Sequence, residues 1–231
     1  TPIVPTKPLK FGTAVIWICF GMGLCVIANA GTSFLVAFFK NLGITLTQGD
    51  VAKPNSIFEC ILDIIGIAIV PAICEEFAMR CCALGLLKNY GKAFGVVSVS
   101  VVFGLLHGNV IQFIFAFLVG LVLAYITIKT ESIIPAMCIH ALNNGMSAVS
   151  DTVNYAAGKE VNVTVGFFAF WLLVGIIATI YLAIKHKLTI PKDDGNCVLT
   201  LGEKVSSFFF PGMILPFIVL IIMTAQTVKI G

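Results

Sequence analysis

The stretch "IAIVPAICEEFAMRCCALG", residues 67–85, places three charged groups inside an otherwise apolar segment. Glu75 and Glu76 are adjacent. Arg80 follows Glu76 by four residues, a spacing that brings two side chains together on one face of a helix. An ion pair between them would leave Glu75 free to point elsewhere. An ionisable group inside a membrane span costs about 2.5–3.5 kcal/mol on insertion scales. If this segment crosses a membrane, its charged residues are therefore candidates for function.

The chain as a whole has the composition of a membrane protein. It has 231 residues, of which 59% are hydrophobic and 11% are charged, and its mean hydropathy is +1.06. Soluble domains contain about 25% charged residues. We expect an all-α fold, a polytopic transmembrane helical bundle of about seven spans, with six to eight as the range, in a single domain over residues 1–231. The segments are 11–39, 57–79, 93–108, 110–128, 133–149, 163–184 and 207–228.

The positive charges predict the orientation of this bundle. If the N-terminus is cytoplasmic and all seven segments cross, ten Lys and Arg residues fall inside and four fall outside. Cytoplasmic loops carry such an excess of positive charge. We therefore expect a multi-pass integral membrane protein with a cytoplasmic N-terminus. The compactness of the chain favours a prokaryotic plasma membrane.

Polar residues on two later segments complete a candidate site. His107 lies one helical turn after Phe103, and Asn144 lies one turn after His140, so each pair shares a helix face. Glu75 and His107 are equally far along the chain from the turn at 88–92, so an antiparallel helix pair would hold them at the same depth. Carboxylates, histidines and an amide are groups that can activate a water and stabilise an oxyanion.

The three motifs together resemble the signature of a known family, the CAAX prenyl protease type 2 and bacteriocin-processing family of intramembrane glutamic endopeptidases. The resemblance covers residues 60–148, which we expect to be the catalytic core. The motifs are Glu75-Glu76-x-x-x-Arg80, Phe103-x-x-x-His107 and His140-x-x-x-Asn144.

This resemblance implies a glutamate-dependent peptidase site inside a membrane-embedded helical bundle. Glu75 would act with His107 as the general base on a water. His140 would hold the developing oxyanion together with Asn144. No cofactor is expected. The residues that would support the site are Glu76, Arg80 and Phe103.

The family also implies the partners. The expected substrate is a membrane-associated peptide or protein, and some members of the family act on prenylated C-terminal peptides. The lipid bilayer is the other partner, and nothing in the sequence suggests a nucleic acid. We expect the site to open towards the cytoplasmic side. The sequence leaves the substrate and the oligomeric state open.

Two alternatives remain from the residues alone. One glutamate and two histidines could bind zinc with a water in the fourth position, as in a membrane metalloprotease, although the sequence has no HExxH motif. The same polar cluster could instead serve as a proton relay, or as the core of an immunity protein without catalysis.

Overall fold

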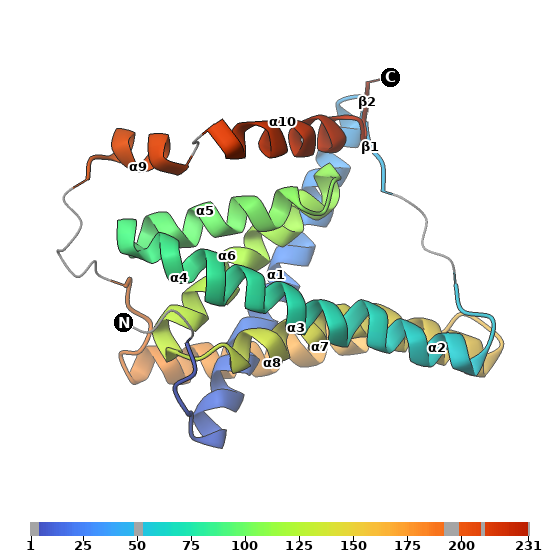
Figure 1. The fold of residues 1–231 in the computed structure, drawn as a ribbon. Helices are drawn as coiled ribbons and strands as arrows, with labels where there is room; N and C mark the ends of the chain where they lie inside the picture. The colour runs from blue at the N-terminus through green and yellow to red at the C-terminus, as the bar shows by residue number, and fades with distance from the viewer. Residues whose placement is uncertain (1–4, 49–52, 192–198, 209–210, 231) are drawn as a thin grey trace.

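The predicted segments are mainly helical over the residues that the structure describes. A computed structural model describes residues 5–48, 53–191, 199–208 and 211–230, and it shows a helical protein with one small two-stranded sheet (Figure 1). The longer helices are α1 (Phe11–Asn41), α5 (Lys92–Leu105), α6 (Val110–Thr130), α7 (Ile134–Ala157), α8 (Val163–Ile184) and α10 (Pro211–Ala225), with the short α9 (Leu201–Phe208) before α10.

The segment that carries the two glutamates is one continuous helical rod that changes its winding. Its parts are α2 (Ile57–Asp63), η1 (Ile64–Ile69), α3 (Val70–Glu76), η2 (Phe77–Ala83), α4 (Leu84–Leu87) and η3 (Lys88–Tyr90). The parts η1 and η2 are wider π-helical turns, a rare form that is frequent at functional sites. Glu75 and Glu76 end the α-helical part between them. The rod is longer than the predicted segment 57–79, since it continues to Tyr90.

Four helical stretches in the described part of the chain are long and apolar enough to cross a membrane. They are Phe11–Asn41, Ile57–Tyr90, Val110–Thr130 and Val163–Ile184. The predicted count of about seven spans is not confirmed by this measure. Helix α5 has 14 residues and is about 21 Å long, short of the ~30 Å hydrocarbon layer. Helix α7 is long, but the polar residues of the candidate site lower its hydropathy.

From the rod to α8, consecutive helical segments alternate in direction, as Figure 1 shows. Lys53 Nζ lies 3.2 Å from Glu160 Oε1, so the start of α2 and the end of α7 lie at the same end of the bundle. Strand β1 (Ile44–Leu46) pairs antiparallel with β2 (Val228–Ile230). The sheet therefore joins the end of α1 to the end of α10.

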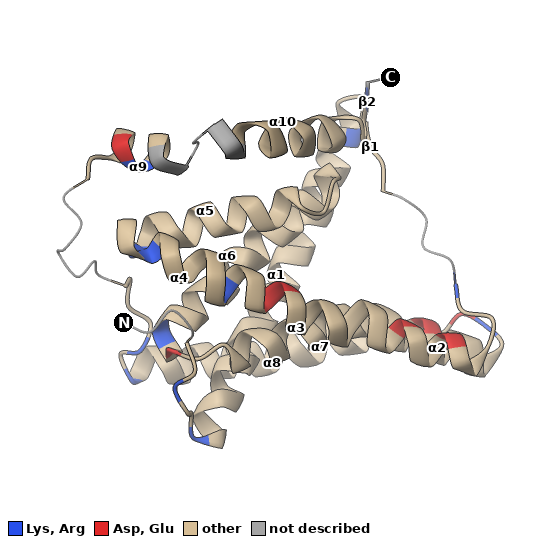
Figure 2. Cartoon of the chain, in the orientation of Figure 1, with Lys and Arg blue, Asp and Glu red and all other residues tan. Residues whose placement is uncertain are grey.

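Basic residues gather at the opposite end of the bundle (Figure 2). There Lys7 Nζ lies 2.6 Å from Glu131 Oε2 in the turn between α6 and α7. The hydrogen bond from Lys7 lowers the pKa of Glu131, and the nearby charges of Lys88 and Lys92 lower it further. The start of α1, the turn before α5 and the turn after α6 therefore meet at one positively charged end, the end predicted from the sequence to be cytoplasmic.

The core lies where α1 crosses α6, α7 and α8. Buried side chains from these helices form one cluster that includes Trp17, Leu123, Ile126 and Ile139. By contrast, large apolar side chains are exposed along the outside of the rod, on α8 and on α10. Such an apolar exterior suits a lipid environment and would be unfavourable in water.

Glycines allow the helices to approach closely within one chain. A Cβ on Gly21 would overlap Ile139 Cδ1, and one on Gly120 would lie 3.1 Å from Ser100 Cα. A close approach of two backbones joins α1 to α8, where a Cβ on Gly23 would lie 2.7 Å from Gly175 Cα. Small residues at helix contacts are a common way to pack helices in membranes.

We expect Gly23→Ala to destabilise the protein by about 1–3 kcal/mol, the usual cost of inserting a methyl group into a packed contact. The backbone of Gly175 cannot move aside without separating α1 from α8. Thermal unfolding in detergent measures the effect. The matched control is Gly31→Ala on the same helix, because a Cβ there meets nothing within 4 Å. Equal unfolding temperatures for the two variants would contradict the close contact.

Candidate active site

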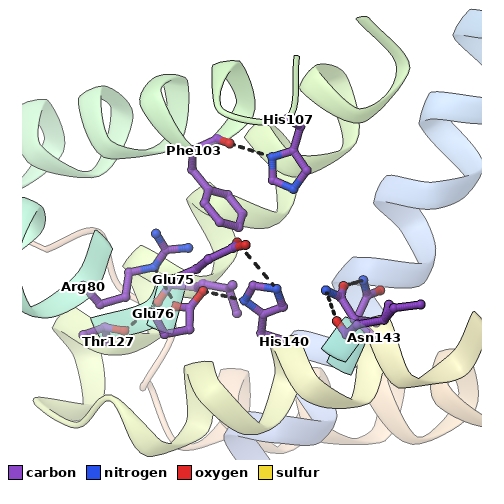
Figure 3. Close-up of polar contacts among 11 residues, drawn as sticks. Glu75, Glu76, Arg80, Phe103, His107, Thr127, His140 and Asn143 are labelled. Carbon is purple, nitrogen blue, oxygen red and sulfur yellow. Dashed lines mark hydrogen bonds and ion pairs between the residues drawn. The ribbon is translucent and has the colours of Figure 1, made fainter. Parts of the chain in front are cut away.

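Three segments bring the predicted residues together: α3 with the following π turn, the end of α5, and the first half of α7 (Figure 3). Glu75 and Glu76 lie at the end of α3. Phe103 lies on α5, and His107 lies in the turn that follows it. His140 and Asn144 lie on α7.

A buried ion pair anchors the site. Arg80 Nε lies 3.0 Å from Glu76 Oε2, and both side chains are 0% exposed. The four-residue spacing on a helix brings them together, as predicted. A buried ion pair must recover a large desolvation cost through close contacts. Glu76 also makes a second contact, with His140.

The second carboxylate oxygen of Glu76 orients His140. Glu76 Oε1 lies 2.8 Å from Nδ1 of the buried His140. Because an ionised carboxylate only accepts hydrogen bonds, Nδ1 is the donor. The other ring nitrogen, Nε2, faces Glu75, whose Oε2 lies 4.0 Å away. This distance is too long for a direct hydrogen bond.

Glu75 differs from Glu76 in its surroundings. Its side chain is 43% exposed, against 0% for Glu76. In Figure 3 its carboxylate points away from Arg80, towards the space bordered by His107 and His140. The two adjacent glutamates therefore face different environments: Glu76 is committed to buried contacts, and Glu75 remains accessible.

The ring of Phe103 packs against three charged or titratable groups. It lies under the guanidinium of Arg80, with 5.0 Å between Arg80 Cζ and the ring centroid. Its edge-on contacts with His107 and His140 have centroid distances of 5.1 Å and 5.8 Å. Among the described residues, the terminal nitrogens of Arg80 have no hydrogen-bond partner, so this cation–π contact is one of their main interactions. Phe103 thus separates the two histidines and fixes both rings.

His107 is held by the backbone of its own helix. Its Nδ1 lies 2.8 Å from the carbonyl oxygen of Phe103. A carbonyl oxygen only accepts, so Nδ1 carries the hydrogen, and in the neutral ring Nε2 keeps its lone pair. Gly108 then turns the chain with φ = 67°, a conformation that favours glycine. Asn109 starts α6 as its N-cap, accepting from Gln112 N at 2.8 Å.

Asn144 contacts the rod at the carbonyl of Ile67, which is available because of a proline four residues later. Pro71 has no N–H, so the carbonyl of Ile67 four residues earlier lacks its usual α-helical donor. Asn144 Nδ2 donates to that carbonyl at 3.2 Å, and Asn143 Nδ2 donates to Asn144 Oδ1 at 3.3 Å. Neither Asn143 nor the Ile67 carbonyl was predicted from the sequence to belong to the site. Pro71 inside an apolar helix was the signal that a free carbonyl needs a partner.

The predicted cluster therefore forms, with one difference in detail. Arg80, Glu76 and His140 are connected in a line, and Glu75 and Phe103 lie against His140. Asn144 shares a face of α7 with His140, as expected. However, one of its two amide hydrogens binds the rod, so at most the other is available to a ligand. The catalytic roles of these residues stay predictions.

The zinc alternative requires three ligands around one point. In the ranges that the structure describes, no three His, Cys, Asp or Glu side chains form a group that could hold a metal ion. The chemistry of Glu75, His107 and His140 still includes the donor types that zinc prefers. The effect of metal removal on activity distinguishes the two mechanisms.

The family comparison agrees with the three motifs. Residues 57–146 match the family model described as type II CAAX prenyl endopeptidase Rce1-like. This range contains all three motifs, so the region that carries them is confirmed to be similar to the predicted family. The match indicates protease activity, and with the four long apolar helices it identifies an integral membrane protein. No curated protein and no solved structure matches the chain significantly.

Proposed function

We propose that this Rce1-like protein is an intramembrane endopeptidase that hydrolyses peptide bonds of a membrane-associated peptide or protein, including lipidated ones. One observation carries the proposal most directly. Of two adjacent glutamates, Glu76 is buried in contacts with Arg80 and His140, and Glu75 is left accessible beside His140. This arrangement separates a structural carboxylate from one that is free to react. The catalytic core of the proposal is residues 60–148.

In the proposed reaction, Glu75 accepts a proton from a water, and the resulting hydroxide attacks the carbonyl carbon of the peptide bond. His107 assists in its neutral form, in which Nε2 has a free lone pair with which to bind the same water. The proton then passes to the leaving amine. A base of this kind contributes about 10²–10⁴-fold to a rate.

His140 and Asn144 are proposed to stabilise the tetrahedral oxyanion. Nδ1 of His140 already donates to Glu76, so Nε2 can donate to an oxyanion only when both ring nitrogens carry hydrogen. We therefore infer that the imidazolium form acts in this step. Its charge lies against the buried carboxylate of Glu76, because Glu75 has taken up the proton of the water by this step. The second amide hydrogen of Asn144 supplies another donor.

The placement in the membrane is part of the same proposal. We propose seven crossings, the short α5 included, with the basic end of the bundle in the cytoplasm and the site opening to that side. Glu75 lies about 22 Å along the rod from Tyr90 and about 27 Å from Ile57. It is therefore near mid-membrane and somewhat closer to the basic end.

We expect the purified protein to cleave members of a quenched fluorescent peptide library, part of it lipidated near the C-terminus, at the same rate with and without a chelator. The proposed mechanism uses no metal. Cleavage lost on chelation and restored by zinc, together with stoichiometric zinc in the purified protein, would favour the metalloprotease. No cleavage by a folded protein, combined with proton-coupled uptake that depends on Glu75, would favour the relay.

A further inference from the structure

The turn that carries His107 is stabilised by a contact with residues that lie outside the matched range 57–146. His107 lies between the end of α5 and the start of α6, so the first turn of α6 fixes its backbone. Asn109 satisfies one of the free N–H groups at this helix start, that of Gln112. The N–H of Val110, the first residue of α6, is not reached by this cap.

Thr227 supplies the missing acceptor. Val110 N donates to Thr227 Oγ1 at 3.1 Å, a contact between residues 117 positions apart. The hydroxyl of Thr227 in turn donates to the carbonyl of Thr224 at 2.7 Å. The hydroxyl therefore both donates and accepts, and its orientation is fixed.

A second contact of the same segment lies against the same turn. The terminal methyl of Met223, one helical turn before Thr227, lies 3.7 Å from the point where a Cβ on Gly108 would be. Helix α10 therefore packs directly beside the residue that follows His107, and Figure 1 shows it alongside α5.

The segment is itself anchored to the rest of the bundle. The carbonyl of Thr227 accepts from Thr47 N at 2.9 Å and from Thr47 Oγ1 at 3.0 Å. Thr47 directly follows β1, which pairs with β2. Thr227 thus connects the start of α6 to the sheet at the end of α1.

We infer that Thr227 is a positioning residue for His107, so that the C-terminal segment takes part in catalysis although it lies outside the matched residues 57–146. This inference rests on the proposed function. Removing the hydroxyl leaves the Val110 N–H without its acceptor and releases the turn. A displacement of about 1 Å at a reacting group can cost about 10²-fold in rate.

The test compares Thr227→Val, which keeps the shape and loses the hydroxyl, with Thr227→Ser, which keeps the hydroxyl. We expect Thr227→Val to lower kcat about 10- to 100-fold with little change in KM, and Thr227→Ser to retain kcat within about threefold. The matched control is Thr224→Val, because within the described residues the Thr224 hydroxyl bonds to Leu220 of its own helix and not to the turn. We expect it to behave as wild type.

Hydrogen exchange of the amides at 105–112 gives a readout that needs no activity. It should become faster in Thr227→Val and remain unchanged in the other two variants. A kcat within about threefold of wild type for Thr227→Val, or an equal loss in Thr224→Val, would overturn the inference. If wild type cleaves nothing, the proposed function fails. Faster exchange would then still establish the contact, but the catalytic role inferred for it would be lost.

Discussion

Replacing Glu75 by Gln is expected to lower the rate of peptide cleavage by about 10³-fold or more, within the range that a general base supplies. The amide has nearly the shape of the carboxylate but cannot take a proton from water. The Glu75 side chain is 43% exposed, and its nearest ionic partner, His140, is 4.0 Å away, so the fold should not depend on its charge. Initial rates on the best library peptide, measured beside the unfolding temperature in detergent, separate activity from stability.

The matched control for this experiment is Asp63→Asn on the same helical rod. It removes a carboxylate in the same way, but about three helical turns away from the site. We expect full activity from this control. If Glu75→Gln kept more than about a tenth of the wild-type rate, Glu75 would not be the base, and His107 would become the candidate for that role.

Arg80→Met is expected to destabilise the protein by about 3–5 kcal/mol, the usual result of removing one partner from a buried pair. The side chain of Glu76 is 0% exposed. If Arg80 is removed, His140 is the close ionic partner that Glu76 keeps among the described residues. Phe103 would also lose the cation above its ring, and the two histidine rings that it separates would be less well fixed. The unfolding temperature in detergent measures the loss.

The double variant Arg80→Met with Glu76→Gln provides the comparison. Replacing both members of a buried pair is often close to neutral, whereas breaking the pair is not. We therefore expect the double variant to be more stable than Arg80→Met alone. It should still be less active than wild type, because a neutral amide in place of the Glu76 carboxylate cannot hold His140 as firmly. A loss below about 1 kcal/mol for Arg80→Met would mean that Glu76 has another source of stabilisation.

Much of the fold follows from the sequence, because a run of about 20 apolar residues is enough to predict a membrane helix. Each apolar segment predicted to form a membrane helix is mainly helical over its described residues, since backbone groups in a lipid layer must bond within their own segment. The ends were less predictable. The rod continues past the predicted limit of 79 to Tyr90, and α5 ends before its predicted limit of 108 because the chain turns at Gly108.

Contacts within one helix were also determined by the sequence. The pairs Glu76–Arg80 and Phe103–His107 are four residues apart, and helical geometry alone brings such residues together. The same geometry predicts that the two polar residues of the third motif share a face of α7. These relationships required no knowledge of how the helices pack.

Only the tertiary structure decided how the helices share their polar groups. Spacing could not tell that His140 would bind Glu76 through Nδ1 and face Glu75 through Nε2. Nor could it place Thr227 against Val110, 117 residues away. The physical reason is that a hydrogen bond between helices depends on their distance, rotation and depth. These are set by packing contacts between helices, such as the close approach of α1 to α8, which a pattern along one helix does not contain.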